Sequence, residues 1–405
     1  MNTITHSPAQ KMPEVSNVQT VSPSTNWRRM FGLRERGVYY ALLLLITVLT
    51  LLTTYLGQAN YLSVLNLSNV VYQSSLMAIM AVAMTVVLIS GNFDLSVASV
   101  AALAAVILIG NADAIGFIPA AALAMAVAMA IGLINGSIVQ FLGINAFIVT
   151  LGTMTAVRGL VLIYTDGRSL SASDPNVIET MKAFEGGRHD GFWLILAGGV
   201  VLLALGIIGL IKAASAKNPV RPSAVGMTIG GAGFLLLAWA SGGELTLRNP
   251  VIYLAIFTTI VWFTLSFTMV GRRLYAVGGN SEAARLSGIN VLLYKLMAFV
   301  FCSGTAGFAG ILFASRLRSI NPAGLSGAEL TVIAAAILGG TSLFGGAGSV
   351  IKTLAGALLL FSLTNGFNML NLGANWQGLI EGIVVVVAAA IYTVGGNKSK
   401  SKTGG

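Results

Sequence analysis

Long charge-free apolar runs, separated by short polar breaks, dominate the sequence. A spanning helix needs about 20 mainly apolar residues, and runs of that order cover 38–56, 59–93, 95–112, 114–157, 191–211, 222–243, 249–271, 296–315, 330–351, 353–380 and 382–397. The run 114–157 is too long for one helix, and residues 140–145 (QFLGIN) break it because Asn, Gln and Gly favour a turn. The pattern predicts an all-α fold, a polytopic transmembrane helical bundle of about twelve membrane segments, some short or re-entrant.

Two glycine-rich runs are expected to serve helix packing. GTAGFAG (304–310) and LGGTSLFGGAGS (338–349) allow close helix contact and broken helices, and the second is expected to form a re-entrant turn. The sequence also contains a weak internal repeat. Five residues have identical counterparts at a constant offset of 230 positions: 135, 136, 142, 143 and 145 match 365, 366, 372, 373 and 375. Duplicated halves often build a transport pathway at their interface, so internal duplication is a hypothesis for this chain.

Composition excludes a soluble globule. Of the 405 residues, 56% are hydrophobic and 9% are charged, against roughly 25% charged in a soluble domain. The net charge is +10, and the basic residues lie between the apolar runs, where they set the orientation of the chain in the membrane. No nucleic-acid partner is therefore expected. The lone Cys302 excludes an intramolecular disulfide and disfavours a cysteine-based metal site, so neither a metal nor another cofactor is expected.

The charges between the runs assign the two sides of the membrane. With the amino terminus inside, most of the 23 basic residues lie inside, and the outer segments are mildly acidic. Both termini are therefore expected in the cytoplasm. The expected units are a disordered cytoplasmic tail (1–38), a first half of the transmembrane domain (39–190), an inserted helical hairpin (191–243), a second half (244–397) with a cytoplasmic loop (271–295), and a second cytoplasmic tail (398–405).

The loop 271–295 is the most polar stretch between spans on the inner side. Asn280 or Ser281 can cap a short helix over 282–286, with Glu282 at its positive end and Gly288 ending it. Such a helix presents Ala and Leu at the membrane edge. It is either an ordinary amphipathic connector or a docking element for a partner protein.

The residues of this loop carry a family resemblance. The spacing Glu282-Ala283-Ala284-x-x-x-Gly288 resembles the EAA loop of ABC importer permeases, and YAVGGNSEAARLSGIN (275–290) is similar to monosaccharide permeases of the ribose and xylose type. SGNFDLSV (90–97), NAFIVTLGTM (145–154) and the carboxyl-terminal third extend the resemblance over most of the chain. The length and the inserted hairpin resemble the xylose type more closely, whereas Asn92 and Phe93 depart from the Gly and Ile usual in the family.

The resemblance implies a permease subunit of a binding-protein-dependent ABC importer in the bacterial inner membrane, which moves a monosaccharide such as xylose or ribose into the cytoplasm by alternating access. The implied partners are cytoplasmic ATP-binding subunits, a periplasmic sugar-binding protein, and a second permease copy in a homo- or heterodimer, within membrane lipid. In that family the loop helix couples to the ATPase. The implied coupling residues are Gly278, Gly279, Asn280, Glu282, Ala283, Ala284 and Gly288.

The residues also indicate that the energy comes from another protein. A P-loop needs a Gly-Lys pair, and no lysine in this chain follows a glycine. The chain is therefore not expected to be an enzyme, and ATP is expected to be bound by partner subunits. The alternatives are a branched-chain amino acid ABC permease, an ion-coupled secondary carrier, and a membrane enzyme, which is disfavoured because no acids, His or Cys cluster at a common depth.

Candidate pathway residues lie near helix ends. Asp94 is interpreted as a cap for the N–H groups of residues 95–97, with direct sugar contact and a surface loop acid as alternatives. Side chains that bind hydroxyls or offer an aromatic face could line a sugar pathway, although interhelical hydrogen bonding and interfacial anchoring explain them equally well. These are Asn145, Thr150, Asn365, Asn368, Asn371, Asn375, Trp376 and Gln377.

Overall fold

The computed structural model describes residues 33–215 and 222–371, together with 379, 382, 383 and 386. Within this part of the chain, nine helices are long and apolar enough to cross a membrane, and α9 and α14 are shorter apolar helices. The helices are α2 (Leu33–Tyr55), α3 (Val64–Ile89), α4 (Val97–Ile115), α5 (Phe117–Phe141), α6 (Ala146–Thr165), α7 (Pro175–Gly186), α8 (Phe192–Ser215), α9 (Pro222–Ala240), α10 (Asn249–Phe267), α11 (Met269–Gly279), α12 (Ser281–Leu286), α13 (Val291–Leu317), α14 (Ala328–Leu338) and α15 (Val350–Met369). The predicted polytopic helical membrane fold is confirmed; its last expected segment, 382–397, lies almost wholly outside the described residues.

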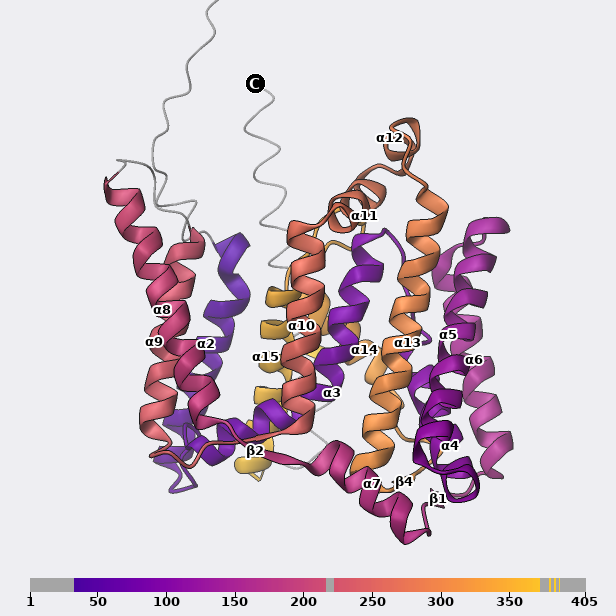
Figure 1. Cartoon of the computed structure of the whole chain (residues 1–405), viewed down its shortest axis with the longest axis horizontal. Coiled ribbons are helices and arrows are strands. Elements are labelled where there is room, and N and C mark those ends of the chain that lie inside the picture. The colour runs from indigo at the N-terminus through magenta and orange to yellow at the C-terminus, as the bar shows by residue number, and fades with distance from the viewer. Residues whose placement is uncertain (1–32, 216–221, 372–378, 380–381, 384–385, 387–405) are drawn as a thin grey trace, which may run out of the picture.

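The apolar helices run side by side between two opposite faces of the molecule (Figure 1). The short helices α11 and α12 project from one face, called here the α12 face. At the opposite face, the α7 face, α7 lies beside two antiparallel two-stranded sheets. In these sheets β1 (Leu170–Ser171) pairs with β4 (Ser319–Ile320), and β2 (Arg188–Asp190) pairs with β3 (Thr246–Arg248).

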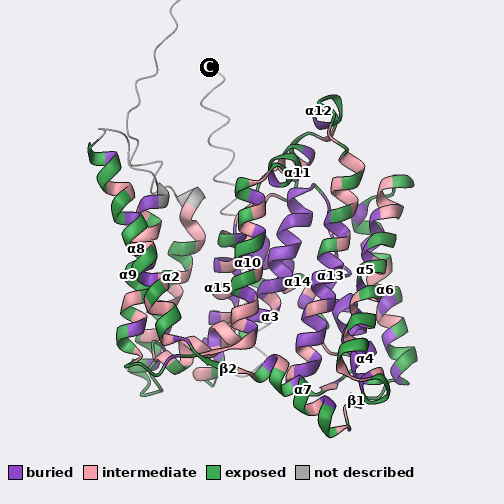
Figure 2. Ribbon diagram, in the orientation of Figure 1, coloured by how far each residue is buried: buried purple, intermediate pink, exposed green. Residues whose placement is uncertain are grey.

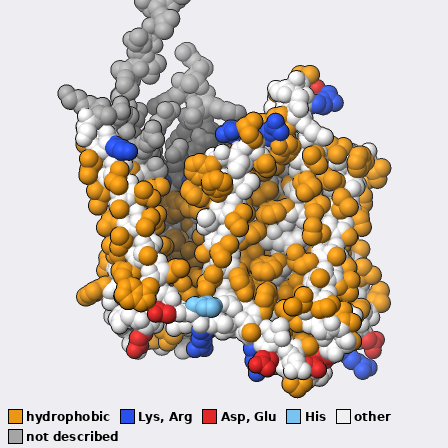
Figure 3. All heavy atoms as spheres, in the orientation of Figure 1, with side chains coloured by type: hydrophobic (Ala, Val, Ile, Leu, Met, Phe, Trp, Pro, Cys, Tyr) orange, Lys and Arg blue, Asp and Glu red, His pale blue; other side chains and the backbone are white. Residues whose placement is uncertain are grey.

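The centre of the bundle consists of α3, α4 and α13 (Figure 2). About seven-tenths of the apolar stretch of each is buried, 72%, 72% and 67% respectively, against 22% for α5 and α6. A helix that is apolar all round must be buried in protein or face lipid. The peripheral helices therefore turn exposed apolar side chains outward, and these cover the surface between the two faces in Figure 3.

Small residues let α13 approach α4 and α5 closely. A methyl group added at Gly307 would lie 2.6 Å from the side chain of Ala128 in α5. One added at Gly310 would overlap the backbone of Ala101 in α4. The expectation that GTAGFAG serves helix packing is therefore confirmed.

The predicted break at 140–145 separates two helices. α5 ends at Phe141 and α6 begins at Ala146. Gly143 takes a positive φ of 68°, a conformation that favours glycine. The Asn145 side chain accepts a hydrogen bond from the N–H of Phe147 at 2.9 Å and so caps α6.

The segment predicted to be an inserted hairpin holds α8 and α9. The two helices pack against each other through small residues, and a methyl group at Gly206 would overlap Thr228. Only 11% of the apolar stretch of α8 is buried, and the pair stands at the edge of the bundle in Figure 1.

The glycine-rich segment 339–349 is a turn between α14 and α15. It reaches the α12 face, where the N–H of Gly346 donates to the carbonyl of Ile89 at the end of α3, at 2.9 Å. The chain arrives there from β4, at the opposite face. The expected turn is therefore present, and α14, the helix before it, has 11 residues, too few to span a membrane alone.

Candidate functional site

The predicted loop helix is present as α12, and local hydrogen bonds define both of its ends. The Asn280 side chain accepts a hydrogen bond from the N–H of Ala283 at 2.9 Å, so Asn280 and not Ser281 is the cap. At the other end, the N–H of Gly288 donates to the carbonyl of Arg285 at 2.9 Å, and Gly288 has a φ of 79°. Asn280 and Gly288 are thus confirmed as the start and stop signals of this helix.

Most of α12 faces away from the bundle. Glu282 and Arg285 form an ion pair at 2.8 Å, with side chains 63% and 70% exposed, and such a solvated pair contributes little to stability. Leu286 is 80% exposed, whereas Ala284 is buried. The helix therefore offers a rigid, capped surface with an apolar end, which suits contact with another protein.

Tyr275 ties α11 to the turn between α14 and α15. Its hydroxyl donates to the carbonyl of Gly348 at 2.9 Å. Burial raises the pKa of Tyr275, so the hydroxyl keeps the proton that it donates. The base of the loop is therefore fixed to the bundle, although its end is exposed.

Asp94 is completely buried between α3 and α4, so the surface-acid interpretation is wrong. One carboxylate oxygen, Oδ1, accepts the N–H of Ser96 at 2.9 Å and the Ser96 hydroxyl at 2.5 Å. Asp94 therefore caps fewer backbone groups than predicted: of residues 95–97, only Ser96 donates its N–H to the carboxylate. The other oxygen, Oδ2, makes no hydrogen bond within the described residues.

Asp94 belongs to a buried polar cluster, defined here as Asp94, Ser96, Asn135 and Thr153. The Asn135 amide donates to the Ser96 hydroxyl at 3.1 Å, and the Thr153 hydroxyl donates to the Asn135 carbonyl oxygen at 2.6 Å. The cluster joins the start of α4 to α5 and α6. In the sequence, Asn135 stood out only as part of the internal repeat. The available signal was an amide side chain inside an apolar helix, because such side chains commonly form hydrogen bonds between helices.

The other candidate pathway residues do not form one site. Asn145 and Thr150 lie on α6, where Asn145 caps the helix and the Thr150 hydroxyl donates to the carbonyl of Ala146 at 2.8 Å. Asn365 and Asn368 lie on α15, with Asn371 just beyond it. Helices α6 and α15 are well separated in Figure 1. Asn375, Trp376 and Gln377 lie outside the described residues.

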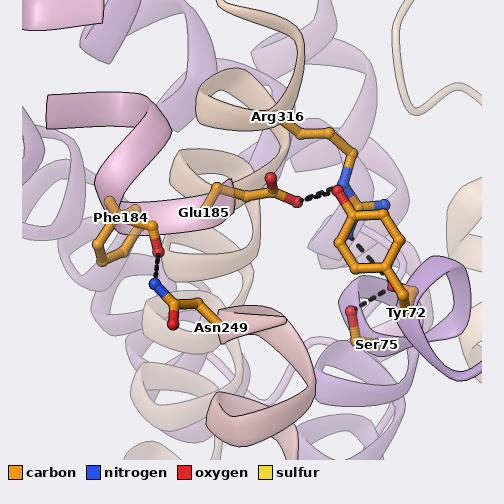
Figure 4. A network of polar contacts seen from close by, with 6 residues as sticks. All are labelled: Tyr72, Ser75, Phe184, Glu185, Asn249 and Arg316. Carbon is orange, nitrogen blue, oxygen red and sulfur yellow. Dashed lines mark hydrogen bonds and ion pairs between the residues drawn. The ribbon is translucent and has the colours of Figure 1, made fainter. Parts of the chain in front are cut away.

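A second polar network, which sequence reasoning missed, holds α7 against the bundle (Figure 4). Glu185 of α7 has a side chain only 5% exposed, and its Oε1 accepts from the Tyr72 hydroxyl at 2.7 Å and from Arg316 Nε at 2.6 Å. The guanidinium of Arg316 also lies 4.2 Å from the centre of the Tyr72 ring. In addition, Asn249 donates its amide to the carbonyl of Phe184 at 3.0 Å. One helix is thereby tied to α3, α10 and α13.

A groove of about 520 Å³ lies between α5, α10 and α13. Its lining is almost wholly apolar and includes Met125, Met129, Phe257, Met297 and Phe301. Sugar recognition needs several convergent polar groups. This groove therefore does not fit a sugar.

Comparisons with known proteins place this geometry in context. Residues 66–389 match the family described as branched-chain amino acid transport system / permease component. The chain is 33% identical over 377 residues to Ribose import permease protein RbsC of Escherichia coli (strain K12), covering 92% of this chain and 98% of that protein. It is 32% identical over 386 residues to Xylose transport system permease protein XylH of Haemophilus influenzae, covering 92% and 100%. No solved structure matches the chain.

Proposed function

The chain belongs to the family of branched-chain amino acid transport system permease components, and from this membership we propose that it is the transmembrane permease subunit of an ABC importer for a monosaccharide. The observation that carries the proposal is α12, a capped helix exposed at one face of a helical bundle. Its sequence has the Glu-Ala-Ala-x-x-x-Gly spacing of a coupling loop. A surface of this kind allows a separate ATPase to act on the bundle.

The α12 face is proposed to be cytoplasmic. It carries Arg272, Arg273 and Arg285, and α2 begins on the same side of the bundle (Figures 1 and 3). An excess of basic residues marks the cytoplasmic side of a bacterial membrane protein. We propose that both termini are cytoplasmic, as the charge pattern of the sequence predicts, and that α7 lies at the periplasmic face, where a sugar-binding protein docks.

The substrate is proposed to be a pentose or hexose such as ribose or xylose. The similar proteins act on ribose and xylose by their names, and they match over most of the chain. The second candidate is a branched-chain amino acid, which the family description names. Uptake of radiolabelled ribose, xylose and leucine by the assembled transporter separates the two candidates.

The proposed mechanism is alternating access powered from outside the chain. ATP binds to the partner subunits, and this chain holds neither ATP nor another cofactor. Closure of the ATPases displaces α12, together with residues 278–288, and rocks the bundle between inward-facing and outward-facing states. A second permease copy completes the pathway.

Co-purification with a co-expressed candidate ATP-binding subunit tests the proposal. The wild type is expected to retain the ATPase in detergent. The double variant Glu282→Lys with Gly288→Pro is expected to lose it, because Pro cannot adopt the φ of 79° at residue 288 and the helix end is displaced. Glu179→Lys, a charge reversal at an exposed site on α7, is the control and is expected to bind the ATPase normally.

The alternative transport class predicts a different result. If the ATPase does not associate with the wild type, and sugar uptake instead follows a proton or sodium gradient, the chain is an ion-coupled carrier. Thermal unfolding of the double variant must match that of the wild type, so that lost binding reports a lost surface and not a lost fold.

A further inference from the structure

The exposed helix α12 reaches the bundle mainly through α11 and α13. α11 in turn packs against α10, α13 and α3. A force applied to α12 by a partner therefore passes largely through α11. The contacts at the end of α11 decide which parts of the bundle receive it.

Three backbone segments meet at the end of α11. The carbonyl oxygen of Ile89, the last residue of α3, accepts the N–H of Gly346 at 2.9 Å. Gly278 of α11 lies against the same carbonyl: a methyl group there would overlap the Ile89 oxygen and lie 2.7 Å from the Gly346 nitrogen. We call Ile89, Gly91, Gly278, Gly345 and Gly346 the glycine junction.

The other glycines of the junction are restricted by the close approach of backbone atoms, by a positive φ, or by both. A methyl group at Gly345 would lie 2.6 Å from the Gly278 oxygen and 2.8 Å from the Cα of Gly91. Gly91 and Gly345 also have positive φ values of 81° and 85°. The three segments therefore touch backbone to backbone, without intervening side chains, and glycine is required for this approach.

Backbone contact transmits displacement differently from side-chain contact. A side chain can absorb a small movement by changing rotamer, whereas closely packed backbone leaves no free volume and must move with its neighbour. Because the Ile89 carbonyl contacts both Gly278 and Gly346, movement of α11 displaces α3 and the α14–α15 turn together.

We propose that the glycine junction is the point at which movement of α12 enters the helix bundle, with Gly278 as the positioning residue for transport. This inference rests on the proposed importer function. Gly278, one of the coupling residues that the resemblance implies, then acts within the bundle at the end of α11, whereas ATPase binding belongs to the exposed surface of α12.

Both branches beyond the junction lead to buried interhelical contacts. From Ile89 the chain runs through Gly91 to Ser96, which the buried polar cluster links to α5 and α6. From Gly346 it enters α15, where the Thr353 hydroxyl is hydrogen-bonded to that of Thr85 in α3 at 2.7 Å. One displacement thus reaches helices on both sides of the buried centre.

Gly278→Ala tests this inference in the complete transporter, reconstituted in liposomes with its ATP-binding subunits and binding protein. Gly152→Ala in α6 is the matched control, since a methyl group there meets no atom within 4 Å. Both changes raise helix propensity. We expect Gly278→Ala to assemble and hydrolyse ATP, but to lower the ratio of sugar imported to ATP hydrolysed by about tenfold or more, and Gly152→Ala to keep the wild-type ratio.

Tyr275→Phe is the second variant, because it removes the hydrogen bond to Gly348 without adding volume. A fall in the same ratio, smaller than that of Gly278→Ala, is expected with an unchanged melting temperature. Should Gly278→Ala fail to assemble, this variant alone decides. An unchanged transport ratio in the assembled variants overturns the inference, whereas loss of ATP-driven uptake in the wild type contradicts the proposed importer itself.

Discussion

Asp94 is buried where two central helices meet, and its interaction with Ser96 is local and specific. Asp94→Ala removes the acceptor for the Ser96 N–H and is expected to lower the free energy of unfolding by about 1–3 kcal/mol. Asp94→Asn keeps an oxygen at the same position and is expected to cost less than about 1 kcal/mol. Thermal unfolding of the purified protein in detergent measures both.

Glu179→Ala, which removes an exposed acid on α7, controls for a general effect of losing a carboxylate. An Asn variant as damaged as the Ala variant would show that the negative charge of Asp94, and not its acceptor oxygen, holds the helix start.

The caps at Asn280 and Asp94 differ in how far they could be predicted from the sequence. The cap at Asn280 contacts a residue three positions away, whereas Asn135 and Ser96 are 39 positions apart and meet only after the helices pack.

At the scale of elements, the position of α7 depends on one buried ion pair, between Glu185 and Arg316. Arg316→Ala leaves the Glu185 carboxylate buried without its cation, and we expect a loss of about 2–4 kcal/mol in the free energy of unfolding. Glu185→Gln combined with Arg316→Met removes both charges and is expected to recover part of that loss. A double-mutant cycle on thermal unfolding, with limited proteolysis of α7, measures the effect.

The ion pair Arg168–Asp166 is the control for burial, because its side chains are 82% and 86% exposed. Arg168→Ala should leave unfolding unchanged, and equal effects at the two pairs would contradict a special role for burial.

Elements long enough to show a period were predictable, including the separation of α5 from α6. The strands were not, because β1 and β4 have two residues each, too few for an alternating pattern, and their paired residues are 148 and 150 positions apart in the chain.

At the scale of the whole molecule, the bundle and the hairpin α8–α9 differ in how they are held. The bundle shares a buried centre of α3, α4 and α13, whereas the close contacts of the hairpin lie largely between its own two helices. The sequence predicted this segment as an insertion, because its apolar runs have no counterpart in the other half. The ribbon of β2 and β3 closes the base of the hairpin, with Asp190 paired to Thr246.

This ribbon makes the hairpin removable by design. Replacing residues 191–245 with Asn-Gly joins Asp190 to Thr246 through a two-residue turn that suits antiparallel strands. We expect the shortened chain to insert, to bind its ATPase, and to melt within about 5 °C of the wild type, since few contacts of the bundle are lost. Deleting residues 188–248, which also removes the ribbon and the stacking of Arg248 on Tyr72, is the control and should melt lower. If the first deletion unfolds as readily as the second, the hairpin is part of the core of the permease. If the first deletion keeps its fold but loses uptake, the hairpin serves transport through a contact outside this chain.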